Sequence, residues 1–153
     1  MDRRQVLKGA GAAGVVSVAI AAGLLKSTDV FAAYNKAGFD TKDAGAAMAA
    51  AGGASAVASA DVVVKAPDIA ENGAVVPVEV ISNIAGTTRI AIVGEKNSQP
   101  LIADFTFSNG GVGYVSTRIK MGATSNIVGV VHAGGKAFKG HKEVKVTIGG
   151  CGG

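Results

Sequence analysis

The only cysteine in the chain, Cys151, lies near the C-terminal end of the sequence between two glycine pairs, Gly149-Gly150 and Gly152-Gly153. A cysteine in a protein core has bulky apolar neighbours, whereas this one has no side-chain neighbour within two residues. Glycine fixes no backbone conformation, and chain ends are ordered only where something docks them. Residues 149–153 are therefore predicted to form a flexible arm with the thiol at its tip. From Ile148, three extended residues reach roughly 10 Å, enough to place the sulfur in another protein's cleft.

The surroundings of this thiol favour a covalent carrier over an enzyme. A nucleophilic cysteine is activated by a neighbouring His or by a helix N-terminus, and the sequence around Cys151 supplies neither. A carrier needs no such activation, because a visiting enzyme can provide it. A single cysteine also cannot form an internal disulfide, so pairing with another protein and covalent substrate chemistry both remain open. We expect no catalytic residue in this chain. The plain alternative is a tail thiol without a function.

The two histidines do not complete a metal site with the cysteine. His132 has the same strand parity as Val130 and is expected to be a half-buried residue at a strand end, whereas His141 is expected to be solvated. Both precede Cys151, but a copper site on a β-sandwich needs a Cys followed by a His in one loop, and zinc needs three or four ligands. We therefore expect no metal site and no resident cofactor.

Charge and composition exclude a nucleic-acid surface. The net charge is only +4 over 153 residues, and residues 1–32 account for +2 of it, with four basic and two acidic side chains. Trp is absent and there are only two Tyr, so no stacking platform for bases is expected. A basic run near the C-terminal strand is either an ordinary solvated face or a surface that attracts an anionic substrate or an acidic partner: Lys136, Lys139, Lys142 and Lys145.

Residues 1–32 have the organisation of an export signal. The adjacent Arg3 and Arg4 precede an uncharged stretch, Gly9–Leu25, and small residues at Val30–Ala32 suit cleavage after Ala32. The paired arginines indicate the twin-arginine route, which carries folded proteins. The alternative is a retained membrane anchor, but the stretch is short and weakly hydrophobic. We expect a soluble periplasmic protein with no membrane contact after the leader is removed.

Residues 33–60 are predicted to form an N-terminal helix and a linker. Asp40 is the expected helix cap, with Asp43 favouring the positive helix end and Phe39 packing back as a hydrophobic staple. Ala44–Ala51 continues the helix and Gly52-Gly53 ends it. The apolar positions form a shallow stripe expected to cover an edge but not to build a core: Phe39, Ala47, Met48 and Ala51. The small residues Ala54–Ala60 are predicted to be a linker.

Residues 61–148 show the pattern of an all-β domain. Short β-branched runs alternate with turn residues such as Asn-Gly and Gly-Gly, as in hairpins. The predicted strands are Val62–Lys65, Ala74–Ser82, Thr87–Val93, Leu101–Ser108, Val112–Met121, Asn126–His132 and Ala137–Ile148. Seven strands within about ninety residues favour an immunoglobulin-like antiparallel β-sandwich.

Alternation within two of these runs predicts which side chains face inward. In one run, Leu101 is expected to share a face with the aromatic residues Phe105 and Phe107 and with Ala103. In the last run the inward residues are expected to be Val144, Val146 and Ile148, which would hold the base of the arm.

Four segments carry a resemblance to a known family: Ala66–Val78, Val115–Gly122, Lys142–Thr147 and the terminal Gly-Gly-Cys-Gly-Gly, the most specific of them. Together with the β-rich body and the twin-arginine-type leader, they closely resemble SoxY, the sulfur-carrier subunit of the periplasmic Sox system for thiosulfate oxidation. The resemblance covers essentially the whole chain and implies an immunoglobulin-like fold.

The resemblance implies that Cys151 is the site of covalent substrate attachment and that Gly149, Gly150, Gly152 and Gly153 form a swinging arm. In the family, a haem enzyme couples thiosulfate to this cysteine, a hydrolase releases sulfate, and in some organisms a molybdenum-containing sulfur dehydrogenase oxidises the remaining sulfur. The carrier works as a heterodimer with SoxZ.

Other interpretations stay open at this point. An exported binding module whose terminal cysteine only forms a disulfide to a partner protein predicts a stable covalent heteromer and no small sulfur adducts. A ubiquitin-like sulfur carrier also ends in Gly-Gly, but it acts through its terminal carboxylate in the cytoplasm, and the export leader and strand pattern here argue against it. An independent thiol enzyme would lack a base.

Overall fold

The computed structural model describes residues 34–108 and 110–147. The chain separates into two compact units, Met1–Tyr34 and Asn35–Gly153, and the fold below is that of the second. The predicted signal peptide (1–32), Ile148 and the predicted arm (149–153) lie outside the described residues.

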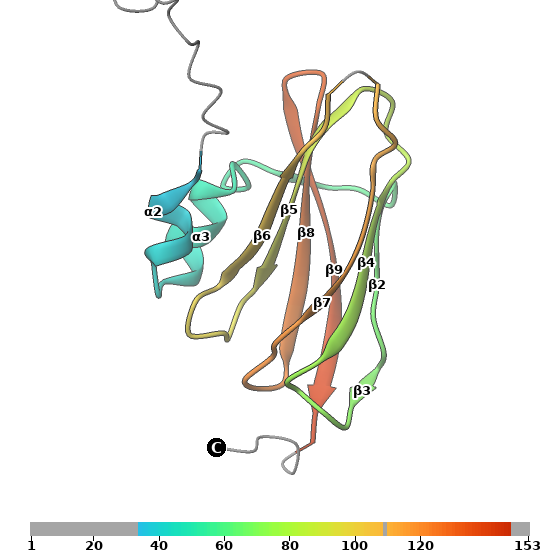
Figure 1. Cartoon of the computed structure of the whole chain (residues 1–153). Helices are drawn as coiled ribbons and strands as arrows, with labels where there is room; N and C mark the ends of the chain where they lie inside the picture. Colours follow the sequence, from blue (N-terminus) through green and yellow to red (C-terminus); the bar gives the residue numbers. More distant parts are fainter. Residues whose placement is uncertain (1–33, 109, 148–153) are drawn as a thin grey trace, which may run out of the picture. The chain divides into compact units, whose positions relative to one another are not determined.

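The strands of the described residues form two sheets (Figure 1). The larger sheet has the order β1-β9-β8-β5-β6, with β3 added beside β9, and the smaller sheet has the order β2-β4-β7. The strands are β1 Val57–Ala58, β2 Val62–Lys65, β3 Ile69–Ala70, β4 Val76–Ser82, β5 Thr87–Gly94, β6 Leu101–Thr106, β7 Tyr114–Ile119, β8 Ser125–Ala133 and β9 Lys136–Val146. The predicted all-β sandwich is confirmed.

Each of the seven predicted runs forms one strand, and the strand ends differ from the prediction by at most two residues where the structure describes them. Alternation explains the agreement: in β4, Val76, Val78 and Val80 are buried between the sheets, while Pro77 between them is exposed. The pairings are antiparallel except at β1 and β3, which run parallel to β9. Neither of these two-residue strands was predicted, and β1 lies in the segment expected to be a linker.

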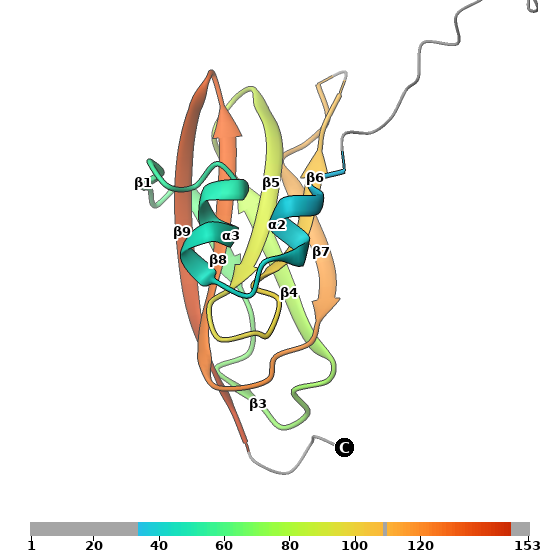
Figure 2. The same ribbon diagram turned by 90° about the vertical axis from the view of Figure 1, so that its left-hand side faces the viewer.

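Two short helices, α2 Lys36–Asp40 and α3 Ala44–Ala50, replace the single predicted helix. They lie on the outer side of the larger sheet, over β5 and β6 (Figure 2). The predicted cap is wrong: Asp40 ends α2, and the carboxylate of Asp43 caps α3 by accepting a hydrogen bond from the N–H of Ala46 at 2.7 Å. The predicted stop is confirmed, since Gly52 follows α3 with a φ of 72°.

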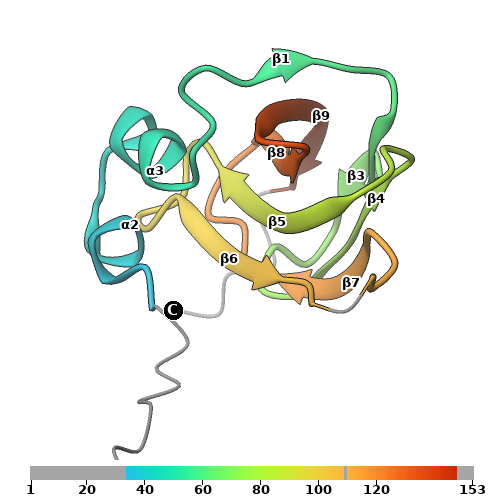
Figure 3. The same cartoon turned by 90° about the horizontal axis from the view of Figure 1, so that it is seen from above.

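Apolar residues gather in two clusters, one on each side of the larger sheet. The first lies between the facing sheets (Figure 3) and is built from β-branched and other large side chains, including Val78, Ile90, Ile127 and Val144. The second lies between the helices and the larger sheet: Ala47, Ala51, Ala91, Val93, Leu101, Val128 and Val130. The helix stripe therefore does more than cover an edge, because Ala47 and Ala51 are fully buried in this second core.

A β-bulge changes the predicted face of Leu101. The pairing of β5 with β6 shifts register between Ile92 and Val93, so that Val93 pairs with Leu101 while Ile92 pairs with Ala103. One extra residue in a strand reverses the side-chain alternation at that point. Leu101 consequently packs in the second cluster, against the helices, and Ala103 packs against the first.

Candidate functional site

The predicted attachment site, Cys151, and the glycines around it, Gly149, Gly150, Gly152 and Gly153, lie outside the described residues. The last described residue is Thr147, four positions before the cysteine. The described part of the site is therefore the end of β9, from which the predicted arm leaves.

Two inward-facing residues fix the end of β9 in the first cluster. Val144 is fully buried, and the half-buried Val146 packs against the same cluster. Glu143, Lys145 and Thr147, between and after them, are exposed. The predicted alternation of the last strand is confirmed for Val144 and Val146, whereas Ile148 lies outside the described residues.

Three consecutive backbone N–H groups at this end are each hydrogen bonded, on alternate sides of the strand. Lys145 N donates to the carbonyl oxygen of Asp68 at 2.9 Å, and Thr147 N donates to that of Ala70 at 3.2 Å. Between them, Val146 N donates to the side-chain oxygen of Thr124 at 2.9 Å. These three bonds are here called the strand-end anchor. Sequence reasoning missed them, because neither a two-residue strand nor a single loop hydroxyl leaves a periodic signal.

Charges at the strand end come in both signs. Lys142 forms an ion pair with the exposed Asp68, and the hydrogen bond and charge of this lysine lower the pKa of Asp68 below its ordinary value. Asp68, Lys142 and Lys145 line a shallow hollow of about 330 Å³ together with Ile69 and Glu143. Two carboxylates therefore accompany the two lysines here.

The predicted basic run does not form one face. Side chains alternate along a strand, so Lys136 and Lys142 have one parity in β9 while Lys139 and Lys145 have the other. The structure thus supports an ordinary solvated distribution of these lysines better than a single surface for an anion or an acidic partner.

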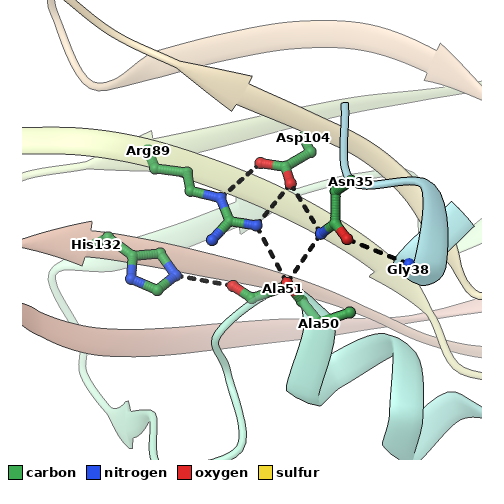
Figure 4. Close-up of polar contacts among 7 residues, drawn as sticks. All are labelled: Asn35, Gly38, Ala50, Ala51, Arg89, Asp104 and His132. Atoms are coloured by element: carbon green, nitrogen blue, oxygen red, sulfur yellow. Dashed lines mark hydrogen bonds and ion pairs between the residues drawn. The ribbon is translucent and has the colours of Figure 1, made fainter. Parts of the chain in front are cut away.

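A second polar group, the polar clamp, joins the helices to the larger sheet (Figure 4). Its side chains are those of Asn35, Arg89, Asp104 and His132. Arg89 pairs with Asp104 through two hydrogen bonds, Nε to Oδ1 at 2.7 Å and Nη2 to Oδ2 at 2.6 Å. Arg89 Nη2 and Asn35 Nδ2 both donate to the carbonyl oxygen of Ala50, at 3.2 and 2.8 Å. These bonds occupy a carbonyl group at the end of α3 that the helix itself leaves without a partner.

His132 completes the clamp. Its Nε2–H donates to the carbonyl oxygen of Ala51 at 2.8 Å. The ring is half-buried, as predicted, and it lies against Gly52, where a Cβ atom would be 2.4 Å from His132 Cε1. His141 is exposed, also as predicted.

Burial and hydrogen bonding act in opposite directions on the clamp carboxylate. Burial alone would raise the pKa of Asp104, but the hydrogen bonds and charge of Arg89, with a further bond from Asn35, outweigh it and hold this pKa below its ordinary value. The same hydrogen bond raises the pKa of Arg89. The pair of Arg89 and Asp104 therefore stays ionised, and the clamp holds the helices on the sheet.

Comparison with known proteins decides the family. The model of the family described as "Sulfur oxidation protein SoxY" matches residues 47–151. The solved structure of the sulfur carrier protein SoxY from Chlorobium limicola f thiosulfatophilum is 45% identical, with a TM-score of 0.60, over 67% of this chain and 94% of that one. The chain belongs to the SoxY family. It is therefore a member of a family of sulfur carrier proteins.

A more distant structure shares only the fold. The superoxide reductase (neelaredoxin) from Ignicoccus hospitalis is 14% identical, with a TM-score of 0.51, over 56% of this chain and 80% of that one. A comparison with curated proteins returned no match. The match to the SoxY family begins at Ala47, within α3, so α2 and Asn35 precede the matched region.

Within residues 34–108 and 110–147, no group of three or more His, Cys, Asp or Glu side chains lies close enough to hold a metal ion. In the same residues, no helix is long and apolar enough to cross a membrane.

Proposed function

We propose that this protein is a periplasmic sulfur carrier in thiosulfate oxidation. Sulfur intermediates are held covalently on Cys151, and Gly149, Gly150, Gly152 and Gly153 form the arm that presents them to successive enzymes. The observation that carries the proposal is the match to the SoxY family, which extends to residue 151. The proposed arm follows a strand end that is hydrogen bonded up to Thr147.

The proposed chemistry balances when the partner enzymes supply the oxidation. The thiolate of Cys151 and thiosulfate form an S–S bond, and two electrons pass to the haem enzyme that couples them. Water then attacks the terminal sulfonate in the hydrolase, which releases sulfate and two protons and leaves a persulfide on the cysteine. A sulfur dehydrogenase, where one operates, takes up electrons from that outer sulfur while water supplies its oxygens, so that it becomes a sulfonate. A second hydrolysis then releases it as sulfate and frees the thiol. The chain itself supplies only the sulfur nucleophile.

The length and the glycine content of the proposed arm suit a carrier whose bound sulfur is processed by separate enzymes. The four residues from Ile148 to Cys151 span at most about 14 Å when extended, a reach that allows the sulfur to enter another protein's cleft. Glycines on both sides of the cysteine carry no side chain that would block a narrow channel. A covalent S–S bond also keeps the intermediates from diffusing away between enzymes.

Location and partners follow from the same proposal. Residues 1–32 are a twin-arginine-type signal peptide that directs export, and the mature chain forms a heterodimer with SoxZ. The haem coupling enzyme, the sulfate-releasing hydrolase and the sulfur dehydrogenase dock only transiently. A Lys-Lys replacement of Arg3 and Arg4 should leave precursor in the cytoplasm, and normal export of that variant would contradict the route.

Intact mass spectrometry of the mature protein from thiosulfate-grown cells tests the carrier role. We expect additions of sulfur and of sulfur plus sulfonate that disappear on treatment with a reductant and map to the C-terminal peptide. The Cys151→Ser variant should carry none of them and should abolish thiosulfate-dependent respiration.

Two outcomes would contradict the carrier role. A cysteine that carries no adduct under any condition, or that forms only a disulfide to one protein, would favour the binding-module interpretation. Respiration that persists in Cys151→Ser would exclude Cys151 as the attachment site.

A further inference from the structure

The backbone ladder between β8 and β9 ends before β9 does. The last pair in that ladder joins Ser125, the first residue of β8, to Val144. Two residues further along, the N–H of Val146 lies beyond the start of β8 and therefore has no backbone acceptor there. The side-chain oxygen of Thr124 accepts this hydrogen bond at 2.9 Å. One hydroxyl group thus extends the ladder by one bond.

The opposite edge of β9 is held by backbone carbonyls. Ile69 and Ala70 of β3 pair with Lys145 and Val146, next to the bonds from Lys145 N and Thr147 N described above. The loop between β3 and β4 is also hydrogen bonded near the end of β9, since Met121 N donates to Gly73 O at 2.7 Å. A Cβ atom at Gly73 would lie 2.6 Å from Met121 O and 2.9 Å from Val146 Cγ1.

We propose that Thr124 is a positioning residue that sets where the rigid body ends and the carrier arm begins. This inference rests on the proposed carrier function. The strand-end anchor has one bond on the β8 side, from Thr124, and two on the β3 side. Without the Thr124 bond, the last residues of β9 are held from one edge only and open more often, so that Lys145 to Thr147 join the arm part of the time.

A longer arm lowers the local concentration of the thiol in a docked enzyme. The proposed arm up to Cys151 would grow from four residues after Thr147 to seven after Val144. Because the effective concentration of a tethered group falls roughly as the −3/2 power of tether length, the rate of coupling in the docked complex should drop by up to about twofold. Docking itself, which uses the body, should not change.

The test compares three variants of adjacent residues. Thr124→Val removes the acceptor and keeps a side chain of similar shape, whereas Thr124→Ser keeps the hydroxyl. Ser125→Ala is the matched control, because the Ser125 hydroxyl is buried and has no hydrogen-bond partner among the described residues. Amide hydrogen exchange at residues 144–147 and steady-state coupling of thiosulfate, with the carrier as the varied substrate, are measured for each in the SoxZ complex.

We expect Thr124→Val to exchange faster at residues 145–147 and to lower kcat by up to about twofold with KM unchanged. A misfolded fraction would instead raise the apparent KM, because the carrier is the substrate. Thr124→Ser should restore both readouts, and Ser125→Ala should match the wild type.

A Thr124→Val variant with the exchange rates and the kcat of the wild type would overturn the positioning role. It would also be overturned if Ser125→Ala changed exchange and kcat as much as Thr124→Val does. These results leave the carrier function intact. If the wild type accepts no sulfur adduct, the proposed function fails and the positioning role fails with it.

Discussion

The helices and the end of β9 are fastened to the same sandwich by different means. The polar clamp holds the helices with side chains, and its centre is the ion pair of Arg89 and Asp104, whose side chains are 27% and 11% exposed. The strand-end anchor consists of backbone N–H groups that donate to two carbonyl oxygens and one hydroxyl group. Charge therefore matters for the first attachment and hardly at all for the second.

This difference fits the tasks of the two regions. Helices that lie on an apolar face need only be held in one place, and an ion pair with shared carbonyl acceptors fixes their position. A strand from which the proposed carrier arm departs must stay attached in different salt and pH conditions. Neutral hydrogen bonds are less sensitive to both than an ion pair is.

Breaking the clamp should have the largest effect on stability. Asp104→Ala leaves the guanidinium of Arg89 partly buried without its partner, and we expect a loss of about 2–3 kcal/mol, below the full cost for a deeply buried pair because Arg89 keeps some contact with water. Thr124→Val, which removes one neutral bond of the anchor, should cost about 1 kcal/mol. Urea unfolding measures both. An equal loss in the two variants would contradict the comparison.

Adding a Cβ atom at one glycine of each attachment should loosen that attachment alone. Gly52 has a φ of 72° and faces the ring of His132, while Gly73 faces the backbone oxygen of Met121. We expect each alanine variant to lose about 1–3 kcal/mol, from backbone strain at Gly52 and from the forced shift at Gly73.

Amide hydrogen exchange separates these two variants. Gly52→Ala should raise exchange in residues 35–51 and leave residues 144–147 protected, and Gly73→Ala should do the reverse. Faster exchange in both segments of either variant would mean that the attachments are coupled.

Acid should weaken the polar clamp more than the strand-end anchor. Arg89 holds the pKa of Asp104 below its ordinary value, against the effect of burial. A carboxylate with a lowered folded-state pKa contributes stability above its unfolded pKa, about 3.9, and that contribution is lost as the pH falls through the folded-state pKa. The wild type should therefore lose stability from about pH 4 downward, and Asp104→Ala should lose less. Urea midpoints at a series of pH values test this, and parallel curves would contradict it.

The smallest effect is expected at the ion pair near the anchor. Asp68→Asn removes the charge that pairs with Lys142 but keeps the backbone carbonyl that accepts from Lys145. Because the carboxylate is exposed, we expect no measurable change in the urea midpoint or in exchange at residues 144–147. A clear loss of protection there would show that charge helps to hold the strand end.

The sequence predicts the sandwich well, because seven β-branched runs are separated by turn residues, and alternation within two of them also predicts an inward face. It does not predict β1 and β3, since two residues are too few to show a period and both depend on β9 for pairing. The bulge beside Val93 is also invisible in the sequence, so Leu101 was assigned to the wrong face.

The candidate site divides in the same way. The base of the proposed arm at Val144 and Val146 follows from alternation, whereas Thr124 acts through one hydroxyl from a loop far away in sequence. The partners in the clamp, Arg89 and Asp104, lie on different strands, and only the pairing of β5 with β6 brings them together. Asp40 and Asp43 both suit a helix cap by residue type. The structure places Asp43 immediately before α3 and Asp40 at the end of α2, which the sequence does not reveal.

Asn35, the N-cap of α2, takes part in the clamp that joins the helices to the larger sheet. Its side chain donates to Ala50 O and to Asp104 Oδ2 and accepts from Gly38 N. Cleavage at the predicted site after Ala32 would leave Asn35 and its three hydrogen bonds in the chain, whereas a cut after Asn35 would remove all three together.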